Sequence, residues 1–352
     1  MDSELSYDTI LEILSRTSLK TLDTIRCTSN EFDTLVHGSE FLDVYKKRNN
    51  MVSGFLVNNM RGTYYSEFVP SPLSNNIDLR FLPFNARVVA SSDQGIIVFE
   101  CPDPKNFRNV FYNVCKPTTK QVLRLPNPKT SRETEKVAII VMGSKTKLRY
   151  KIVRLSYPTA SQPNEELYTL NCEIFDSEKG AWGWLDPIRL PYGVFLIKNS
   201  QAITARGSIN MLLNNGDILM FDAYEDKWTC VSSPVPTLDE CEFATPMQLV
   251  KYAGKLGIAW KPANASWEIW FLSHHQSFKK LHVFSKKEDS ERESLQALYD
   301  SDTSIMVDHN TLIFHRFKRG HNINKVVLSD HPCQIFNFRS DFESVDFRYV
   351  HK

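Results

Sequence analysis

A short unit recurs along most of this 352-residue chain, and it restricts the possible folds more than any other feature. Each copy has an apolar strand, a tight polar turn, and an aromatic or β-branched residue that opens the return strand. The residues that open the return strands of four clear and two weaker copies are Tyr64, Val122, Trp182, Trp228, Phe278 and Ile335. A repeat of roughly 40–50 residues is typical of four-stranded propeller blades. Six copies therefore predict about six blades.

The residues between these anchors favour strands over helices. From Met51 onward, short β-rich runs alternate with clusters of Asn, Asp, Gly, Pro and Ser, and helical periodicity fades. We predict one all-β, propeller-like domain over residues 51–352. The last predicted strand, residues 344–350, is expected to pair with the first blade and close the ring, which would leave no exposed sheet edge. Because β-turn chemistry is shared by all β-proteins, a partly open array of sheets is the alternative.

The first 50 residues have a helical pattern instead. Between Asp8 and Arg16 the apolar residues recur at helical spacing, and Ser18 and Ser29 each precede a further short run, as N-caps do. Three or four helices in so few residues bury only about 60% of their unfolded surface. We therefore expect a small all-α module over residues 2–50 that packs on a partner, either the downstream domain or another protein.

Residues 5–49 resemble an F-box, whose pattern begins L-P-x-D-x-x-x-E-I-L-x-R and continues through R-C-x-S to a short helix. The matching residues are Leu5, Asp8, Glu12, Ile13, Leu14, Arg16, Leu19, Leu22, Arg26, Cys27, Ser29, Phe32, Leu35 and Phe41. Ser6 and Ser18 stand where the family has proline, which fixes the chain at a helix start, and Phe32 stands where tryptophan is common.

The F-box resemblance implies a partner. In that family the helices bind a Skp-family adaptor, and through it a cullin-based ubiquitin ligase. The apolar stripe of the helices would lie in the adaptor's groove, as helix-in-groove recognition requires. The residues assigned to this surface are Leu5, Ile10, Leu11, Ile13, Leu14, Leu19, Leu22 and Ile25.

The rest of the chain resembles the F-box-associated domains of plant F-box proteins. Five weak motifs occur in the family's order. They are D-Q-G-I-I-V-F-E from Asp93, C-K-P-T-T-K-Q-V-L-R-L-P from Cys115, Y-K-I-V-R-L from Tyr150, G-K-L from Gly254 with W-E-I-W from Trp267, and F-R-S-D-F-E-S-V-D-F from Phe338. The resemblance implies a domain that recruits the protein to be ubiquitinated. It identifies no substrate-binding residue, because the ligand differs between members.

Composition excludes several other classes of protein. Lys+Arg 42 against Asp+Glu 41 gives a net charge of +1, which does not predict nucleic-acid binding. The sequence has no basic-then-apolar leader and no apolar run of about 18 residues, so no membrane partner is expected. Seven scattered cysteines without C-x-x-C indicate free thiols in a reducing compartment. We expect a cytoplasmic or nuclear protein.

Motifs for chemistry are missing. No phosphate-binding glycine loop, G-x-S-x-G or H-E-x-x-H occurs, and we predict neither catalytic residues nor a cofactor. The histidines (His274, His275, His309, His315 and His321) are predicted to be turn and surface residues rather than metal ligands. The charged run over residues 279–293 is predicted to be a solvated loop. The six tryptophans are predicted to pack between blades.

Three functions remain open. The first is a substrate-recognition adaptor of a Skp–cullin–F-box (SCF) ubiquitin ligase. The second is a degenerate F-box protein, weakened at Ser6 and Ser18, that acts as an adaptor-free binding module or decoy. The third and most remote is a propeller enzyme, in which scattered charged residues would have to converge on the central channel. The candidates for that are Asp217, Asp226, Glu268, Arg206 and Arg189.

Overall fold

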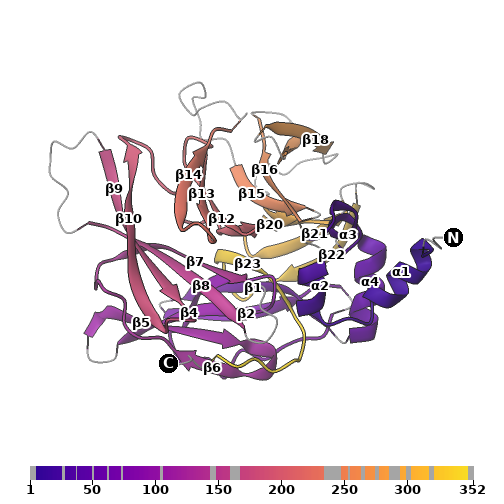
Figure 1. The fold of residues 1–352 in the computed structure, drawn as a ribbon, viewed down its shortest axis with the longest axis horizontal. Coiled ribbons are helices and arrows are strands. Elements are labelled where there is room, and N and C mark those ends of the chain that lie inside the picture. The colour runs from indigo at the N-terminus through magenta and orange to yellow at the C-terminus, as the bar shows by residue number, and fades with distance from the viewer. Residues whose placement is uncertain are drawn as a thin grey trace.

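The computed structural model shows a small helical module followed by a ring of β-sheets (Figure 1). It describes residues 5–25, 28–36, 38–49, 51–61, 63–72, 74–103, 106–142, 148–158, 167–233, 247–252, 254–262, 266–273, 277–284, 294–298, 303–316 and 321–347. The helices are α1 (Tyr7–Leu14), α2 (Leu19–Ile25), α3 (Asn30–Val36) and α4 (Ser39–Asn49).

The strands of the described residues form six antiparallel sheets arranged around a common centre, which is a six-bladed propeller (Figure 1). Blade 1 contains β23 (Pro332–Ser340), β1 (Val52–Arg61) and β2 (Thr63–Pro70). Blade 2 contains β3 (Arg87–Ser91), β4 (Ile97–Asp103), β5 (Asn106–Lys116) and β6 (Gln121–Arg124), with the 3-10 turn η1 (Pro117–Thr119) before β6. Blade 3 contains β7 (Thr134–Met142), β8 (Arg149–Ser156), β9 (Leu167–Asp176) and β10 (Ala181–Pro191).

The other three blades repeat this order. Blade 4 contains β11 (Ile203–Ala205), β12 (Ser208–Leu212), β13 (Ile218–Asp222) and β14 (Lys227–Val231). Blade 5 contains β15 (Met247–Tyr252), β16 (Lys255–Trp260), β17 (Trp267–Leu272) and β18 (Phe278–Phe284). Blade 6 contains β19 (Ser294–Leu298), β20 (Thr303–Asp308), β21 (Thr311–Arg316) and β22 (His321–Val327).

Apolar clusters lie between each pair of neighbouring blades, and they fix the circular order. Blades 2 and 3 share a cluster that contains Val114, Phe175 and Trp182, and blades 5 and 6 share one that contains Trp267 and Met306. Four further clusters join blades 3 and 4, 4 and 5, 6 and 1, and 1 and 2. The predicted packing of tryptophans between blades is therefore confirmed for Trp182 and Trp267. It is wrong for Trp184, which is exposed on the outer strand β10.

The ring is closed by β23, which is not the strand that the sequence predicted. β23 pairs with β1 over Val52↔Ser340 to Asn59↔Pro332, whereas residues 344–347 form no strand and 348–350 lie outside the described residues. A closing strand must be apolar on both faces because it packs between two blades. Phe336 and Phe338 of β23 join the cluster with blade 2, and Ile335 joins the cluster with blade 6. The 344–350 sequence instead alternates apolar with polar residues through Val345, Asp346, Phe347 and Arg348, so it has one apolar face.

One copy of the repeat was also assigned wrongly. The segment V-V-L-S-D-H-P-C-Q-I, which ends at Ile335, joins β22 of blade 6 to β23 of blade 1, and these two strands do not pair. The true last hairpin is β21–β22, in which Arg316 pairs with His321. The blade count of six is nevertheless correct.

Blade 1 has three strands, and the 71–86 segment crosses the molecule beside it. β2 ends with Pro70 opposite Gly54, at the end of the propeller where the helices join. β3 begins at the other end, where Asn58 Nδ2 donates to Val88 O (2.6 Å). Leu79 of the crossing segment is buried in the cluster between blades 1 and 2. The segment therefore covers apolar surface between blades 1 and 2.

The closing blade depends on a glycine, and this gives a stability test. A Cβ on Gly54 of β1 would lie 2.2 Å from Val69 O and 2.8 Å from Phe68 Cζ, whereas one on Gly183 of β10 would meet nothing nearer than 3.8 Å. We expect Gly54→Ala to lower the free energy of unfolding by at least about 2 kcal/mol. The matched control Gly183→Ala should change it by less than about 0.5 kcal/mol. Equal midpoints for the two variants in urea unfolding would contradict this packing of β1 against β2.

Candidate functional site

The helical module has its own apolar core, and this core contains part of the predicted adaptor-binding stripe. Leu11, Leu14 and Leu22 are buried there, together with Val36, Phe41, Leu42, Tyr45 and Met51. Ile10 and Ile25 are partly buried against the same cluster. Leu5 and Ile13 are exposed, Ile13 by 50%, and the side chain of Leu19 lies outside the described residues. The stripe therefore has an inner half that holds the module together and an outer half that is accessible.

Tyr7 adds to the accessible half. Leu5, Tyr7 and Ile13 are the large hydrophobic side chains most exposed among the described residues of the module. All three belong to α1 or its N-terminal approach. The sequence pattern did not select Tyr7, because its place on the helix is evident only once the structure shows that α1 begins at residue 7. The name "α1 apolar surface" is used below for Leu5, Tyr7 and Ile13.

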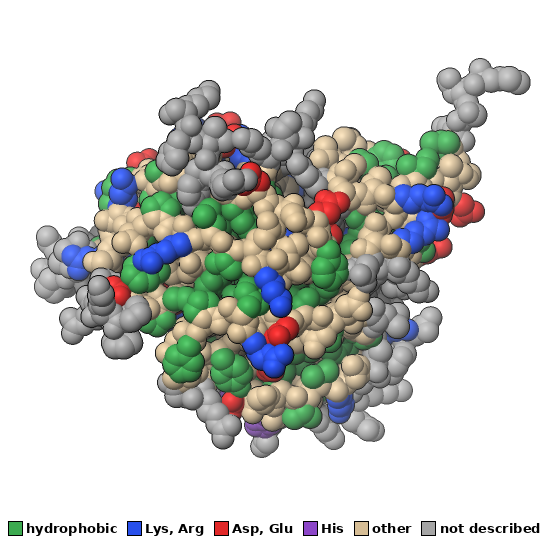
Figure 2. Space-filling view, turned by 90° about the horizontal axis from the view of Figure 1, so that it is seen from below, with side chains coloured by type: hydrophobic (Ala, Val, Ile, Leu, Met, Phe, Trp, Pro, Cys, Tyr) green, Lys and Arg blue, Asp and Glu red, His purple; other side chains and the backbone are tan. Residues whose placement is uncertain are grey.

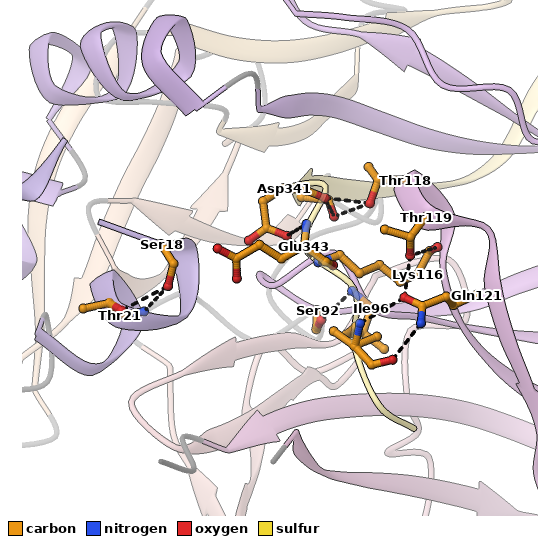
Figure 3. A network of polar contacts seen from close by, with 12 residues as sticks. Ser18, Thr21, Ser92, Ile96, Lys116, Thr118, Thr119, Gln121, Asp341 and Glu343 are labelled. Carbon is orange, nitrogen blue, oxygen red and sulfur yellow. Dashed lines mark hydrogen bonds and ion pairs between the residues drawn. The ribbon is translucent and has the colours of Figure 1, made fainter. Parts of the chain in front are cut away.

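Both serines that replace family prolines begin a helix. Ser6 Oγ accepts from the backbone N–H of Thr9 (3.2 Å), and Ser18 Oγ accepts from that of Thr21 (3.1 Å), a contact visible in Figure 3. An N-cap of this kind satisfies one of the free N–H groups of the first turn and stabilises a helix by about 1 kcal/mol. Both positions therefore still favour the start of a helix, but through a side-chain hydrogen bond rather than through the fixed backbone angle of proline.

Helix α4 fixes α1 and leads directly into the propeller. Arg48 of α4 donates to Ser15 Oγ (2.6 Å) and pairs with Glu12, which also pairs with Arg16. The Arg48 and Arg16 guanidinium groups hold the pKa of the Glu12 carboxyl below its usual value. Asn49 Nδ2 donates to Ser15 O (2.7 Å), so the end of α1 is tied to the end of α4.

The junction between module and propeller is short. Only residues 50 and 51 separate α4 from β1. The guanidinium of Arg339, in β23, lies 5.6 Å from the ring centre of Tyr45, in α4, a distance at which a cation is attracted by an aromatic ring. The module is therefore attached to the closing blade by its chain and by a side-chain contact.

A second polar site lies where the 341–347 segment leaves β23 and contacts the β5–β6 connection of blade 2 (Figure 3). The buried Lys116 pairs with Asp341 and donates to Glu343 O (2.6 Å). Gln121 donates to Val345 O (2.8 Å) and accepts from Val345 N (2.9 Å).

The same segment ends in the core. Phe347 is buried between blades 2 and 3, with its ring 6.2 Å from that of Tyr150. A groove of about 300 Å³ lies between the segment and β6 and is lined by Gln121, Val122, Leu123, Val345, Asp346 and Phe347. The groove is the space between residues 345–347 and the outer strand of blade 2, β6.

The 192–201 loop, which joins β10 to β11, is held by side chains from two blades. Asn214 Nδ2 donates to Gly193 O (2.8 Å), and its Oδ1 accepts from Phe195 N (2.9 Å). On the other side, Lys136 Nζ donates to Ile197 O (2.9 Å), Lys198 O (2.8 Å) and Ser200 O (2.7 Å). Such direct backbone contacts make this loop a well-defined surface feature.

The central channel is crossed by polar contacts. Lys251 of β15 pairs with Asp93, from the β3–β4 turn, and donates to Thr204 O (2.8 Å). The remote enzyme hypothesis required Asp217, Asp226, Glu268, Arg206 and Arg189 to converge on this channel. Asp226 instead pairs with Lys151 (2.7 Å) at the β13–β14 turn, and Glu268 pairs with Lys280 (2.5 Å).

The other candidates for convergence also lie apart. Asp217 accepts from Asn215 (2.8 Å) at the β12–β13 turn. Arg189 is exposed on the outer strand β10, and Arg206 lies in the β11–β12 turn. The structure thus distributes these five groups over blades 3, 4 and 5, with the three of blade 4 in turns at both of its ends, and it does not bring them together as a catalytic cluster.

The remaining sequence candidates are structural. His309 lies in the β20–β21 turn, as predicted, and its backbone O accepts from His331 Nδ1 (2.7 Å). His315 is buried in β21, so its prediction as a turn or surface residue is wrong. His274, His275 and most of the 279–293 run lie outside the described residues. Within the described ranges, no three His, Cys, Asp or Glu side chains gather as metal ligands do. No described helix is long and apolar enough to span a membrane.

Exposed hydrophobic side chains are the remaining candidates for recognition. In the view of Figure 2 they are distributed in small groups between polar residues rather than as one large patch. Scattered apolar side chains are ordinary on a protein surface. Position and rigidity must therefore decide which of them can bind a partner.

These features define a class: a six-bladed propeller that carries a small helical module on its closing blade. Residues 59–314 match the family described as the F-box associated beta propeller domain. The chain is also 30% identical over 188 residues to F-box protein At5g41720 of Arabidopsis thaliana, a match that covers 50% of this chain and 99% of that protein. The chain belongs to the F-box associated beta propeller family.

Two solved structures match this chain with lower sequence identity. Apo AztD from Citrobacter koseri matches with a TM-score of 0.40 and 8% identity, over 84% of this chain and 100% of that one. The Aleuria aurantia lectin AAL matches with a TM-score of 0.43 and 10% identity, over 78% and 95%.

The contacts of buried Lys136 with the 192–201 loop give a prediction about the pH dependence of stability. Burial lowers the pKa of Lys136 from 10.5 to about 8. Above that pH the folded chain releases a proton that the unfolded chain keeps, so this group makes the free energy of unfolding rise with pH, by at most about 1.4 kcal/mol per pH unit. The advantage of wild type over Lys136→Met should therefore increase between pH 8 and the ordinary lysine range, as measured by urea unfolding. Lys179→Met, on an exposed turn, is the matched control; a pH-independent difference for Lys136→Met would show that Lys136 has an ordinary pKa.

Proposed function

We propose that this protein is the substrate-recognition adaptor of an SCF-type ubiquitin ligase. Residues 5–49 act as an F-box that binds a Skp-family adaptor and, through it, a cullin. The propeller holds the protein to be ubiquitinated. The observation that carries the proposal is an F-box-associated propeller whose closing blade bears a helical module with an exposed apolar surface on α1.

The adaptor interface is proposed to use the outer half of the predicted stripe. Leu5, Tyr7 and Ile13 are exposed and apolar, as an interface core requires. Leu11, Leu14 and Leu22 contribute indirectly, because their burial in the module holds α1 in place. Leu19 remains assigned to the adaptor interface by its resemblance to the F-box pattern.

The proposed mechanism is positioning rather than chemistry on the target. A ligase adaptor accelerates transfer by holding a target lysine near a charged ubiquitin-conjugating enzyme, which replaces a bimolecular encounter by a local one. This works best when the two binding surfaces keep a fixed relative position. The contacts of α4 with α1 and the short α4–β1 junction support such a fixed geometry.

The degenerate F-box alternative loses its main argument. It rested on the replacement of two helix-starting prolines by Ser6 and Ser18, and both serines act as N-caps. The proposed location is the cytoplasm or the nucleus. Its support is that the described cysteines, Cys101, Cys115, Cys172, Cys230 and Cys333, are free thiols, as is usual in a reducing compartment.

Binding to a purified Skp-family adaptor tests the proposal. Leu5→Asp with Ile13→Asp places two charges on the α1 apolar surface without entering the module core. We expect affinity to fall at least about a hundredfold, because each desolvated charge costs more than about 1.4 kcal/mol. Binding is measured by calorimetry on the full chain.

The control is Asn30→Asp, which adds a charge at an exposed position at the start of α3, where the helix dipole favours it. This variant should bind like wild type. If folded wild type does not bind the adaptor, the ligase function is wrong. If the double variant binds as tightly as wild type, the α1 apolar surface is not the interface.

A further inference from the structure

We propose that the outer end of blade 3 docks an extended segment of the target protein in which apolar side chains alternate with acidic ones. This inference deepens the proposed function and rests on it for the identity of the ligand as a ligase target. The docking surface consists of Leu167, Arg189, Tyr192, Phe195 and Lys198, and it is called the blade 3 surface below.

The apolar part of the blade 3 surface is unusually exposed. Tyr192 is 85% exposed, Phe195 50% and Leu167 45%. Burying aromatic side chains of this size contributes much of the binding energy in protein interfaces, and Tyr is among the residues enriched in hot spots. Their exposure in the free protein leaves that energy available to a partner.

Strand pairing and a tight turn place these three residues at the same end of blade 3. Leu167, at the start of β9, pairs with Pro191, at the end of β10. Tyr192 is the next residue, and Val194 N donates to Pro191 O (3.0 Å), which folds the chain back before Phe195. The three hydrophobic residues thus surround one corner of blade 3.

The backbone under this corner is fixed before any ligand binds. Asn214 holds Gly193 O and Phe195 N, and Ile197 N donates to Leu212 O (3.0 Å). Lys136 holds three carbonyls of the same loop. A preorganised loop loses little conformational entropy on binding, so more of the contact energy appears as affinity. Tyr192 and Phe195 project from a rigid support.

Charge selects the chemistry of the ligand. Arg189 pairs with Thr169, two residues from the Leu167–Pro191 pair, and strand alternation therefore places Arg189 on the same sheet face as Leu167. Lys198, three residues after Phe195, is also exposed. The 189–199 sequence contains these two cations and no acidic residue. Acidic side chains of a ligand would pair with both cations while its apolar side chains cover the aromatic corner. Glu165 and Glu166, which precede Leu167, lie outside the described residues.

The place of this surface fits a ligase adaptor. In Figure 1 β9 and β10 lie on the left of the molecule and the helical module on the right. Pro191 leads into an inner strand, and the helices join at the opposite end of the propeller, where β23 ends opposite Val52. A peptide on blade 3 would therefore leave the α1 apolar surface accessible.

Binding of synthetic peptides to the full-length chain tests the proposal. The probes are peptides of about 12 residues, long enough to cover one blade edge, in which Leu or Phe alternates with Asp or Glu. A second set carries Lys or Arg in place of the acids. We expect wild type to bind the acidic set in preference to the basic set, with affinity measured by fluorescence anisotropy.

Variants decide where the peptides bind. Tyr192→Ser with Phe195→Ser should weaken binding of the acidic set at least about tenfold, and Arg189→Glu with Lys198→Glu should reverse the preference toward the basic set. Tyr224→Ser is the matched control, since Tyr224 is an exposed tyrosine on the β13–β14 turn of another blade. Unchanged affinity in the Tyr192/Phe195 variant, or no binding of acidic peptides by folded wild type, would overturn the proposal.

The same preparations separate this proposal from the ligase function. The Tyr192/Phe195 variant should bind the Skp-family adaptor like wild type. If peptides bind at blade 3 but the adaptor does not bind, the docking surface stands and the ligase function is wrong. If the adaptor binds and no acidic peptide does, the ligase function stands and the blade 3 surface is wrong.

Discussion

The pairing of β23 with β1 holds the propeller closed, and the remaining architecture depends on it. β23 supplies the inner strand of blade 1, so its side chains enter two of the inter-blade clusters, one with blade 6 and one with blade 2. Without this pairing, two sheet faces that are now buried would be exposed to water at once. Burial of apolar area is the main favourable term in folding, so the two ends of the domain must meet before blades 6, 1 and 2 gain their full packing.

The residues that follow β23 add further contacts across the closed ring. Lys116, Gln121 and Tyr150 hold the 341–347 segment against blades 2 and 3, while the other side of β23 contacts α4 through Arg339 and Tyr45. The C-terminal end of β23 therefore connects the helical module, through Arg339, to blades 2 and 3, through the 341–347 segment. A module attached in this way moves with the ring, because it is fixed to the strand that the whole ring shares.

The sequence predicted what depends on local pattern and missed what depends on distant partners. Alternating runs and shared turns are local, and they gave six blades and the helical start. The closing strand could not be found this way, because its partner lies almost 300 residues away and its two apolar faces are explained only by two neighbouring blades. The helical stripe was likewise predicted as a whole. Periodicity identifies an apolar face, but only the packed module shows that Leu11 and Leu14 are inside it and Ile13 is outside. Tyr192 and Phe195 were missed because exposure in a loop has no periodic signal.

Where such a propeller can bind a partner follows from what its core already uses. The centre is crossed by the pair of Lys251 with Asp93, so a ligand entering there would have to replace a partly buried ion pair. The faces of the blades are buried in the apolar clusters between neighbouring blades. Loops at the ends of the blades remain, and the 192–201 loop is held through its backbone groups rather than through its aromatic side chains. The support and the binding residues are therefore separate. Tyr192 and Phe195 can be exchanged without disturbing the Lys136 and Asn214 contacts that shape the loop, which is the property a common scaffold needs if its members are to recognise different proteins.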